Sequence, residues 1–248
     1  MLEHVAMRGA QLRSLLRAVA DKAARDGVGA TLKRSAAIAA ARLSGRSPQP
    51  RTSGGFDAEF GTDTQEIVPL WRLDIDSPFR AQGVRYEASD PEVVRKTLDS
   101  LPIRHEDFTF VDLGSGKGRT LLVASEYPFR RVLGVEFSPE LCDIARENFR
   151  RYVGPRVRCA DVMSVCADAA DWPPPRGNLV FFLFNPFGKD VFERVIAGLA
   201  SSLGEEDRTV YLIYCNAVHA GLLDACGFLE RLALPVPAAI YRHVPATL

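Results

Sequence analysis

The chain has 248 residues, of which 47% are hydrophobic and 25% charged, and its formal net charge is zero. These are ordinary globular values, and no stretch approaches the roughly 18 apolar residues of a membrane span. With no secretory h-region at the N-terminus, the sequence predicts a soluble, cytoplasmic protein. The five cysteines form no Cys-x-x-Cys pair, so we expect reduced thiols and no metal site.

The zero net charge hides a basic N-terminal arm. Residues 1–51 contain ten Arg or Lys against three acids, a formal charge of +7, and the remainder is −7. Apolar residues at helical spacing predict two amphipathic helices over 1–46, followed by a Pro/Gly/Ser linker over 47–55. Such an arm could pack on the core or form a homodimer, contact nucleic acid, or lie on an anionic membrane. Packing is the favoured interpretation. A mitochondrial transit peptide is less favoured, because the Ala/Arg/Gly-rich composition of the arm continues through the rest of the chain and looks bacterial.

Residues 56–89 mix acids and aromatics with few helix signals, which predicts an irregular lid or substrate segment. Trp71, Asp74 and Asp76 could select an acceptor or could anchor the segment to the core. A regular helix should follow, because Asp90 is a good N-cap and Pro91 suits the first helical position.

An apolar strand over 108–113 runs directly into three alternating glycines, Gly114, Gly116 and Gly118. Glycines there allow a sharp turn and a close approach to a ligand. A dinucleotide fingerprint would need another glycine where Arg119 stands, and a P-loop would need glycine and Ser or Thr where Val111 and Gly118 stand. The loop sequence therefore argues against binding of NAD or ATP.

Asp112 together with the three glycines resembles the first motif of class I S-adenosylmethionine-dependent methyltransferases. The resemblance implies an α/β, doubly wound, mostly parallel seven-stranded Rossmann-like sheet over 90–248, with an antiparallel last strand. It also implies S-adenosyl-L-methionine as the cofactor. The loop is similar to that of some lysine methyltransferases, and by that similarity Tyr86 would close over the methionine half of the cofactor. Plain packing is the alternative for this ring.

Glu136 stands at the end of the predicted strand over 131–137. A carboxylate at this position can accept hydrogen bonds from both ribose hydroxyls. Phe137 beside it is expected to line the same site. Ser138 and Pro139 should then cap and open a helix that stops at Gly154-Pro155.

A third strand is predicted over 163–166, and three acids of similar local sequence lie near it. By the family pattern Asp168 would accept from the adenine amino group, with Ala169 beside it; Asp161 and Asp171 are the residues that could be confused with Asp168.

The fourth strand, 178–184, ends in Asn185-Pro186-Phe187-Gly188. Amino-methylating members of the family carry Asn/Asp-Pro-Pro-aromatic here and hold the acceptor nitrogen through a side-chain oxygen and a backbone carbonyl. Asn185 and Pro186 match that pattern, whereas Phe187 and Gly188 depart from it. A turn that only ends the strand is the alternative of comparable weight. By the same resemblance Asn185 could also contact the cofactor.

The predicted C-terminal elements are a helix over 190–203, a strand over 209–214, a short helix over 222–226 and closing strands over 228–234 and 238–243. His219, just beyond the fifth strand, could act as the general base if the acceptor begins as an ammonium group; a loop or helix-cap role is the alternative.

Three functions therefore compete. The first is methyl transfer to nitrogen on a small molecule or protein side chain, predicted from Asn185 and Pro186 and from the loop that is similar to that of lysine methyltransferases. The second is a nucleic-acid methyltransferase that uses the basic arm, although the remainder of the chain is acidic. The third is a non-catalytic cofactor-binding module or an aminopropyltransferase, which ranks last because only Asn185 follows the fourth strand where paired acids would be expected.

Overall fold

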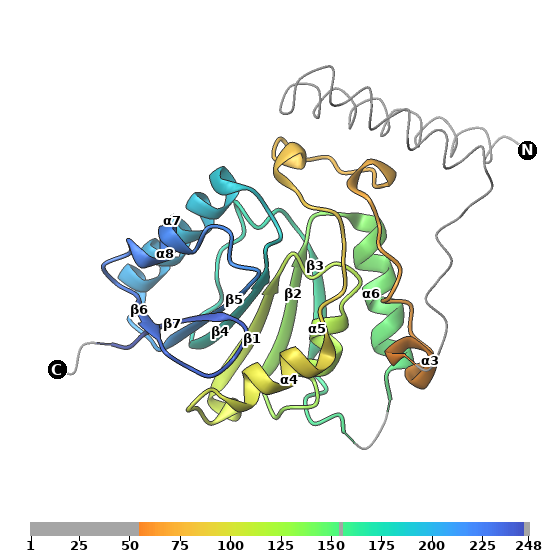
Figure 1. Ribbon diagram of the computed structural model, residues 1–248, viewed down its shortest axis with the longest axis horizontal. Helices are drawn as coiled ribbons and strands as arrows, with labels where there is room; N and C mark the ends of the chain where they lie inside the picture. The colour runs from red at the N-terminus through yellow and green to blue at the C-terminus, as the bar shows by residue number, and fades with distance from the viewer. Residues whose placement is uncertain (1–54, 154–155, 246–248) are drawn as a thin grey trace, which may run out of the picture.

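The computed structural model describes residues 55–153 and 156–245 (Figure 1). The predicted arm over 1–46, and with it the proposed homodimer contact, lies outside the described residues, as does nearly all of the linker. Within the described residues, no helix is both long and apolar enough to cross a membrane.

A single seven-stranded sheet organises the chain, in the order β3-β2-β1-β4-β5-β7-β6. Neighbouring strands from β3 to β5 are parallel, and β7 runs antiparallel to both β5 and β6. The predicted α/β fold with an antiparallel last strand is confirmed. The strands are β1 (Phe108–Leu113), β2 (Arg131–Glu136), β3 (Val162–Cys166), β4 (Asn178–Phe184), β5 (Val210–Cys215), β6 (Glu230–Leu232) and β7 (Ala239–His243).

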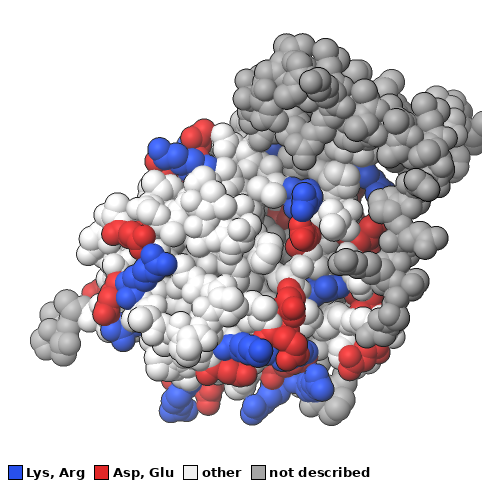
Figure 2. Space-filling model, in the orientation of Figure 1, with Lys and Arg blue, Asp and Glu red and all other residues white. Residues whose placement is uncertain are grey.

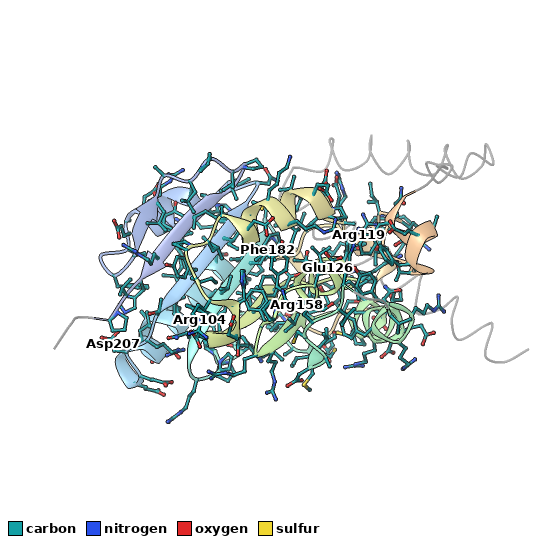
Figure 3. All side chains as sticks on the ribbon, turned by 90° about the horizontal axis from the view of Figure 1, so that it is seen from below. Arg104, Arg119, Glu126, Arg158, Phe182 and Asp207 are labelled. Atoms are coloured by element: carbon teal, nitrogen blue, oxygen red, sulfur yellow. The ribbon has the colours of Figure 1, made fainter. Side chains whose placement is uncertain are left out.

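Helices cover both faces of this sheet (Figure 1). On one face lie α4 (Pro91–Asp99), α5 (Arg119–Ala124) and α6 (Pro139–Arg151); on the other lie α7 (Lys189–Glu205) and α8 (Ala220–Asp224). Successive residues of β1 point to opposite faces of the sheet. Phe110 packs with α4 and α5, whereas Val111 and Leu113 pack with α7. Phe182 of β4, labelled in Figure 3, is buried in the apolar cluster that also contains side chains of α4 and α5.

The helix starts follow the predicted capping residues. The Asp90 carboxylate accepts from the Glu92 N–H at 2.8 Å, and the Ser138 hydroxyl accepts from the Leu141 N–H at 3.3 Å. Several ends differ from the prediction by one to four residues: α6 already stops at Arg151, α7 continues to Glu205, and β6 is limited to Glu230–Leu232.

The segment before the sheet contains more helix than predicted. It forms α3 (Phe56–Phe60) and the 3-10 turns η1 (Leu70–Arg72) and η2 (Arg80–Gln82); a third turn, η3 (His105–Asp107), precedes β1. The segment has an apolar cluster of its own, in which Leu73, Ile75 and Tyr86 pack on Leu141 of α6. It is therefore packed against α6 and does not stand apart from the core.

Replacing Phe110 by alanine tests this core. The Phe110 side chain is fully buried, and its ring centroid lies 5.4 Å from that of Phe129. We expect Phe110→Ala to lower the free energy of unfolding by about 3–5 kcal/mol, measured by urea denaturation. Val153→Ala, at a side chain that is 76% exposed, should change it by less than about 0.5 kcal/mol. Equal losses in the two variants would contradict the assigned core.

Candidate active site

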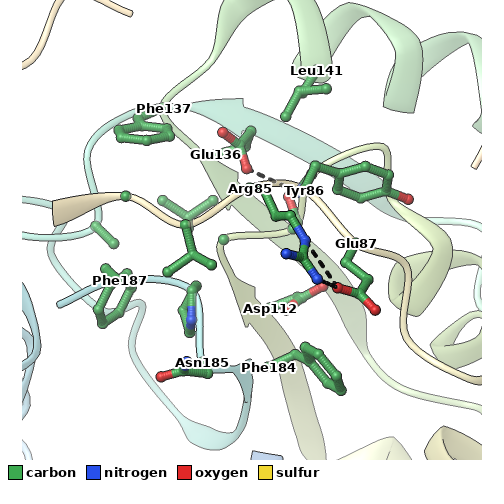
Figure 4. Close-up of a pocket in the computed structure, with 18 of the residues that line it drawn as sticks. Arg85, Tyr86, Glu87, Asp112, Glu136, Phe137, Leu141, Phe184, Asn185 and Phe187 are labelled. Carbon is green, nitrogen blue, oxygen red and sulfur yellow. Dashed lines mark hydrogen bonds and ion pairs between the residues drawn. The ribbon is translucent and has the colours of Figure 1, made fainter. Parts of the chain in front are cut away.

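A cavity of about 260 Å³ opens at the carboxyl end of the sheet (Figure 4). Its walls are the glycine loop after β1, the end of β2 and the end of β4. Residues 79–89, which we call the covering segment, pass over it and contribute Phe79 and a run from Gly83 to Ser89. Ligands of open α/β sheets bind at this edge, so the position alone marks a candidate site.

The glycine loop approaches two other parts of the chain too closely for any side chain. Gly114 and Gly116 have φ values of +80° and +53°. A Cβ atom at Gly114 would lie 2.3 Å from Pro186 Cβ, and one at Gly116 would lie 2.1 Å from the Tyr86 ring. The missing side chains let the end of β4 and the covering segment rest directly on this loop.

Glu136 lies at the base of the cavity and is almost completely buried. Its two carboxylate oxygens accept from the N–H groups of Gly116 and Ser138, each at 2.9 Å. Burial raises its pKa to about 7, although these backbone donors oppose the rise. Asp112, also buried, has its pKa raised to about 8, first by burial and then by the charge of Glu136.

Of the three acids near β3, the structure brings only Asp168 to the cavity. Asp168 accepts from the Ser77 hydroxyl and, at 2.9 Å, from the Ala170 N–H. Asp161 instead pairs with Arg131 at 2.6 Å, and Asp171 pairs with Arg194. The cavity lining also includes Phe137 and Ala169.

Tyr86 lines the cavity through its ring. The hydroxyl donates to the Thr64 carbonyl oxygen at 2.6 Å, and the ring covers Gly116. Burial raises the pKa of this phenol, so it keeps its proton at neutral pH. Tyr86 therefore connects the glycine loop with residues more than twenty positions earlier in the chain.

A polar cluster behind the glycine loop, which we call the clamp (Asp57, Asp63, Thr64, Lys117 and Arg119), was not predicted from the sequence. Lys117 Nζ lies 2.8 Å from Asp63 Oδ1, with a side chain that is only 2% exposed. Arg119 Nε donates to Thr64 Oγ1 at 2.7 Å, and Asp57 accepts from the N–H and hydroxyl of Thr64. Lys117 and Arg119 thus hold the segment that precedes the sheet. The one sequence feature that could have indicated this cluster is the presence of two cationic residues in and next to the glycine loop.

The end of β4 forms the opposite wall. Asn185 adopts a left-handed conformation with φ +43°, and its Oδ1 accepts from the Tyr214 hydroxyl at 3.3 Å. The Pro186 carbonyl accepts from the Val84 N–H at 3.2 Å, which joins this edge to the covering segment. Phe187 is 8% exposed and packs on Phe192, so most of its side chain belongs to the core. Each of these two oxygens accepts one bond and keeps a second lone pair, so the nitrogen site at Asn185 and Pro186 stays a prediction.

His219 does not belong to the cavity lining. Its N–H donates to the Tyr214 hydroxyl at 3.3 Å, and its ring lies 6.2 Å from that of Phe192. The predicted base is therefore displaced from the site because the chain turns into α8 immediately after this residue. Trp71, Asp74 and Asp76 are likewise absent from the lining.

Residues 110–206 match the family model described as a methyltransferase domain. This stretch is less than half of the chain; its similarity to methyltransferase domains supports the predicted S-adenosyl-L-methionine-dependent methyltransferase and its cofactor. No curated protein matches the chain.

Several solved structures of methyltransferases are similar to part of the chain at low sequence identity. An RNA methyltransferase from Salinibacter ruber, in complex with S-adenosyl-L-homocysteine, is 20% identical over 65% of this chain and 95% of its own, with a TM-score of 0.42. Magnesium protoporphyrin IX methyltransferase from Synechocystis PCC 6803, with bound cofactor, is 14% identical over 63% and 79%, with a TM-score of 0.45. A dimethyladenosine transferase from Plasmodium falciparum is 12% identical over 64% and 62%, with a TM-score of 0.47.

The cavity of this methyltransferase domain fits its cofactor. The Ser115 hydroxyl, which is buried and lines the cavity, has no hydrogen-bond partner among the described residues. The Glu136 oxygens each retain a lone pair beyond the backbone bonds described above. When bound, the cofactor supplies a methyl group on a positively charged sulfur.

The variant Gly116→Ala tests the close packing of the methyltransferase loop. The new methyl would meet the Tyr86 ring at 2.1 Å in a backbone conformation that L residues avoid. We expect calorimetry to show at least a tenfold loss of cofactor affinity, since displacing the Tyr86 ring or the loop at a cost of about 1.4 kcal/mol is enough to weaken binding tenfold. Gly198→Ala, in α7 with open space around it, should leave the affinity unchanged. Unchanged affinity in Gly116→Ala would show that the loop tolerates a Cβ.

The two buried acids predict how the stability of the cofactor-free protein depends on pH. The pKa of Asp112 is raised from 3.8 to about 8 and that of Glu136 from 4.5 to about 7, so the folded state binds more protons than the unfolded state between these values. The free energy of unfolding should therefore fall as the pH rises from about 5 to about 8. Asp112→Asn should flatten this decline in urea denaturation across the range; an unaltered slope would remove Asp112 as its source.

Proposed function

We propose that this domain transfers the methyl group of S-adenosyl-L-methionine to an acceptor on a small molecule or a protein side chain, bound at the end of β4. The observation that carries the proposal is the contact of Gly114 with Pro186, through which the cofactor loop and the β4 edge form one continuous wall. A methyl donor on the loop and a nucleophile on the edge would then be neighbours.

The proposed cofactor contacts follow from the residues that line the cavity. Glu136 accepts the ribose hydroxyls, and Asp168 accepts from the adenine amino group with Phe137 and Ala169 against the base. The loop from Asp112 to Gly118 and the Tyr86 ring enclose the methionine half.

Alignment is the main contribution that we propose for the protein in this reaction. A sulfonium is a good leaving group, so holding donor and acceptor in line can supply up to about 7–11 kcal/mol of barrier reduction without a protein nucleophile. The covering segment fixes this geometry, because its backbone bonds to the β4 edge at Val84 and at Gln82, whose carbonyl accepts from the Gly188 N–H at 2.7 Å. By excluding water, the same segment strengthens the electrostatic contacts in the cavity.

The acceptor class is inferred from the charged side chains on one face of the described part of the chain. On the face in Figure 2, Lys and Arg side chains are interspersed with Asp and Glu over the described part of the chain, with no continuous basic field. Nucleic-acid binding depends mainly on such a field, so this face favours a small molecule or a protein side chain.

Cofactor binding tests the assignments of Glu136 and Asp168. We expect Glu136→Ala and Asp168→Ala each to weaken S-adenosylmethionine binding by about tenfold or more in calorimetry, since a bond to a charged group contributes about 1.5–3 kcal/mol. Asp161→Ala, which removes only the pair with Arg131 outside the cavity, should bind normally. Normal binding by both cavity variants would overturn the assignments.

Methyl transfer itself is tested with cofactor labelled on its methyl group and an extract of the native host, separated into protein, nucleic-acid and small-molecule fractions. Glu136→Ala serves as the blank. Label above the blank in the protein or small-molecule fraction is the expected result. Label in the nucleic-acid fraction would replace the proposed acceptor class, and label in no fraction would contradict catalysis.

A further inference from the structure

Two free cysteines lie on neighbouring elements at the cofactor end of the sheet. Cys142 is buried near the start of α6, and Cys166 is the exposed last residue of β3. Helix α6 packs beside β2 and β3 (Figure 1). The pair therefore connects a helix with a strand, which a search of the sequence for Cys-x-x-Cys spacing does not find.

Strand register places the Cys166 side chain on the face of the sheet that α6 covers. β2 and β3 are parallel, and Glu136 lies opposite Cys166. Alternate residues of a strand share one face, so Cys166 points to the same side as Val162. Val162 packs on the same apolar cluster as Phe149 of α6. Cys166 therefore faces the helix that carries Cys142.

The Glu136 carbonyl oxygen fixes the position of the second sulfur. The Cys142 thiol donates to this oxygen at 3.3 Å. The same oxygen accepts from the N–H of Ala167, the residue after Cys166, at 2.9 Å. Burial raises the pKa of Cys142 to about 12, and hydrogen bonding to the Cys166 thiol adds to the rise. The two thiols are thus neighbours at the junction of β2, β3 and α6.

Access to solvent gives the two thiols different roles in an exchange reaction. Cys166 is exposed, so a dissolved disulfide can reach its sulfur. Cys142 is buried and its pKa is raised, so it reacts slowly with a reagent in solution. Once Cys166 carries a mixed disulfide, Cys142 has that sulfur as its neighbour, and the second step gains from proximity.

The pair borders the proposed cofactor site without belonging to it. Neither cysteine lines the cavity, whereas Leu141, Ala167 and Asp168 do. Leu141 precedes Cys142 directly, and Asp168 follows Cys166 by two residues. A change at the sulfur atoms therefore acts on the backbone that positions the proposed adenine contact.

We propose that Cys142 and Cys166 form a reversible disulfide that weakens cofactor binding; the inference rests on the proposed cofactor contacts of Glu136 and Asp168. The oxidant is a low-molecular-weight disulfide. The Cys166 thiolate attacks one of its sulfur atoms and releases a first small thiol, and the Cys142 thiolate then attacks the Cys166 sulfur and releases a second. Both cysteines are oxidised, the small disulfide is reduced, and the two cysteine protons end on the released thiols.

Formation of this bond has to move the edge of the site. The sulfur atoms of a disulfide are about 2 Å apart, closer than two unbonded thiols approach, so the end of β3 or the start of α6 must shift. Cys142 also loses the S–H that it donates to the Glu136 carbonyl. Both changes alter the position of Glu136 relative to Asp168, on which the proposed ribose and adenine contacts depend.

Peptide mapping tests whether the disulfide forms. The full chain is incubated with oxidised glutathione, remaining thiols are alkylated, and the protein is digested with trypsin. Cleavage after Arg places Cys142 on peptide 132–146 and Cys166 on peptide 159–176, which also contains Cys159. The expected product is these two peptides joined, two hydrogen atoms lighter than both together.

Two serine variants identify the cysteine in the longer peptide. The linked product should persist in Cys159→Ser and be absent from Cys166→Ser. A link that survives in Cys166→Ser would overturn the proposed pair. So would glutathione that stays on Cys166 of the unmodified chain with no link to Cys142.

Calorimetry with S-adenosylmethionine tests the effect on the site. We expect the oxidised chain to bind about tenfold more weakly or worse, and dithiothreitol to restore the affinity. Cys166→Ser should bind equally before and after the glutathione treatment. Unchanged affinity in the crosslinked chain would overturn the proposal, as would a loss that accompanies unfolding in far-UV circular dichroism. Failure of the reduced chain to bind would instead refute the proposed cofactor contacts, since peptide mapping reports the disulfide independently.

Discussion

The whole site depends on two backbone contacts that only glycine allows. Because Gly114 and Gly116 have no Cβ, the loop after β1 touches Pro186 on one side and the Tyr86 ring on the other. The first contact joins the cofactor loop to the β4 edge, and the second joins it to the covering segment. Three regions distant in sequence thereby become the walls of one cavity, whose shape is determined by packed backbone and ring atoms and not by flexible side chains.

The clamp explains how the covering segment is held in place. Lys117 and Arg119 are nearly buried cations, which would be strongly unfavourable without Asp63, Thr64 and Asp57. Since Tyr86 of the covering segment bonds to the Thr64 carbonyl, any movement of the chain at Thr64 would disturb the ring above Gly116. Residues of the glycine loop that do not line the cavity, such as Lys117, can therefore influence cofactor binding through the position of this segment.

The strands and helix starts could be predicted from the sequence because the features that determine them lie within a few residues of one another. Buried strands appear as apolar runs, and caps such as Asp90 and Ser138 satisfy donors only two or three residues away. Glu136 reached the cavity as predicted because a residue at the end of a parallel strand has little freedom in position. The clamp, the role of Tyr214 and the displacement of His219 escaped prediction, since each depends on partners whose position only the tertiary fold determines. Lys117 and Asp63, for example, are 54 positions apart.

Burial of Asp112 and Glu136 connects stability with ligand binding. Desolvation disfavours their ionised forms in the empty cavity, as their raised pKa values show. A cofactor that brings ribose hydroxyls and a positive sulfur provides the donors and the charge that these carboxylates lack, so part of the desolvation cost is offset only when it binds.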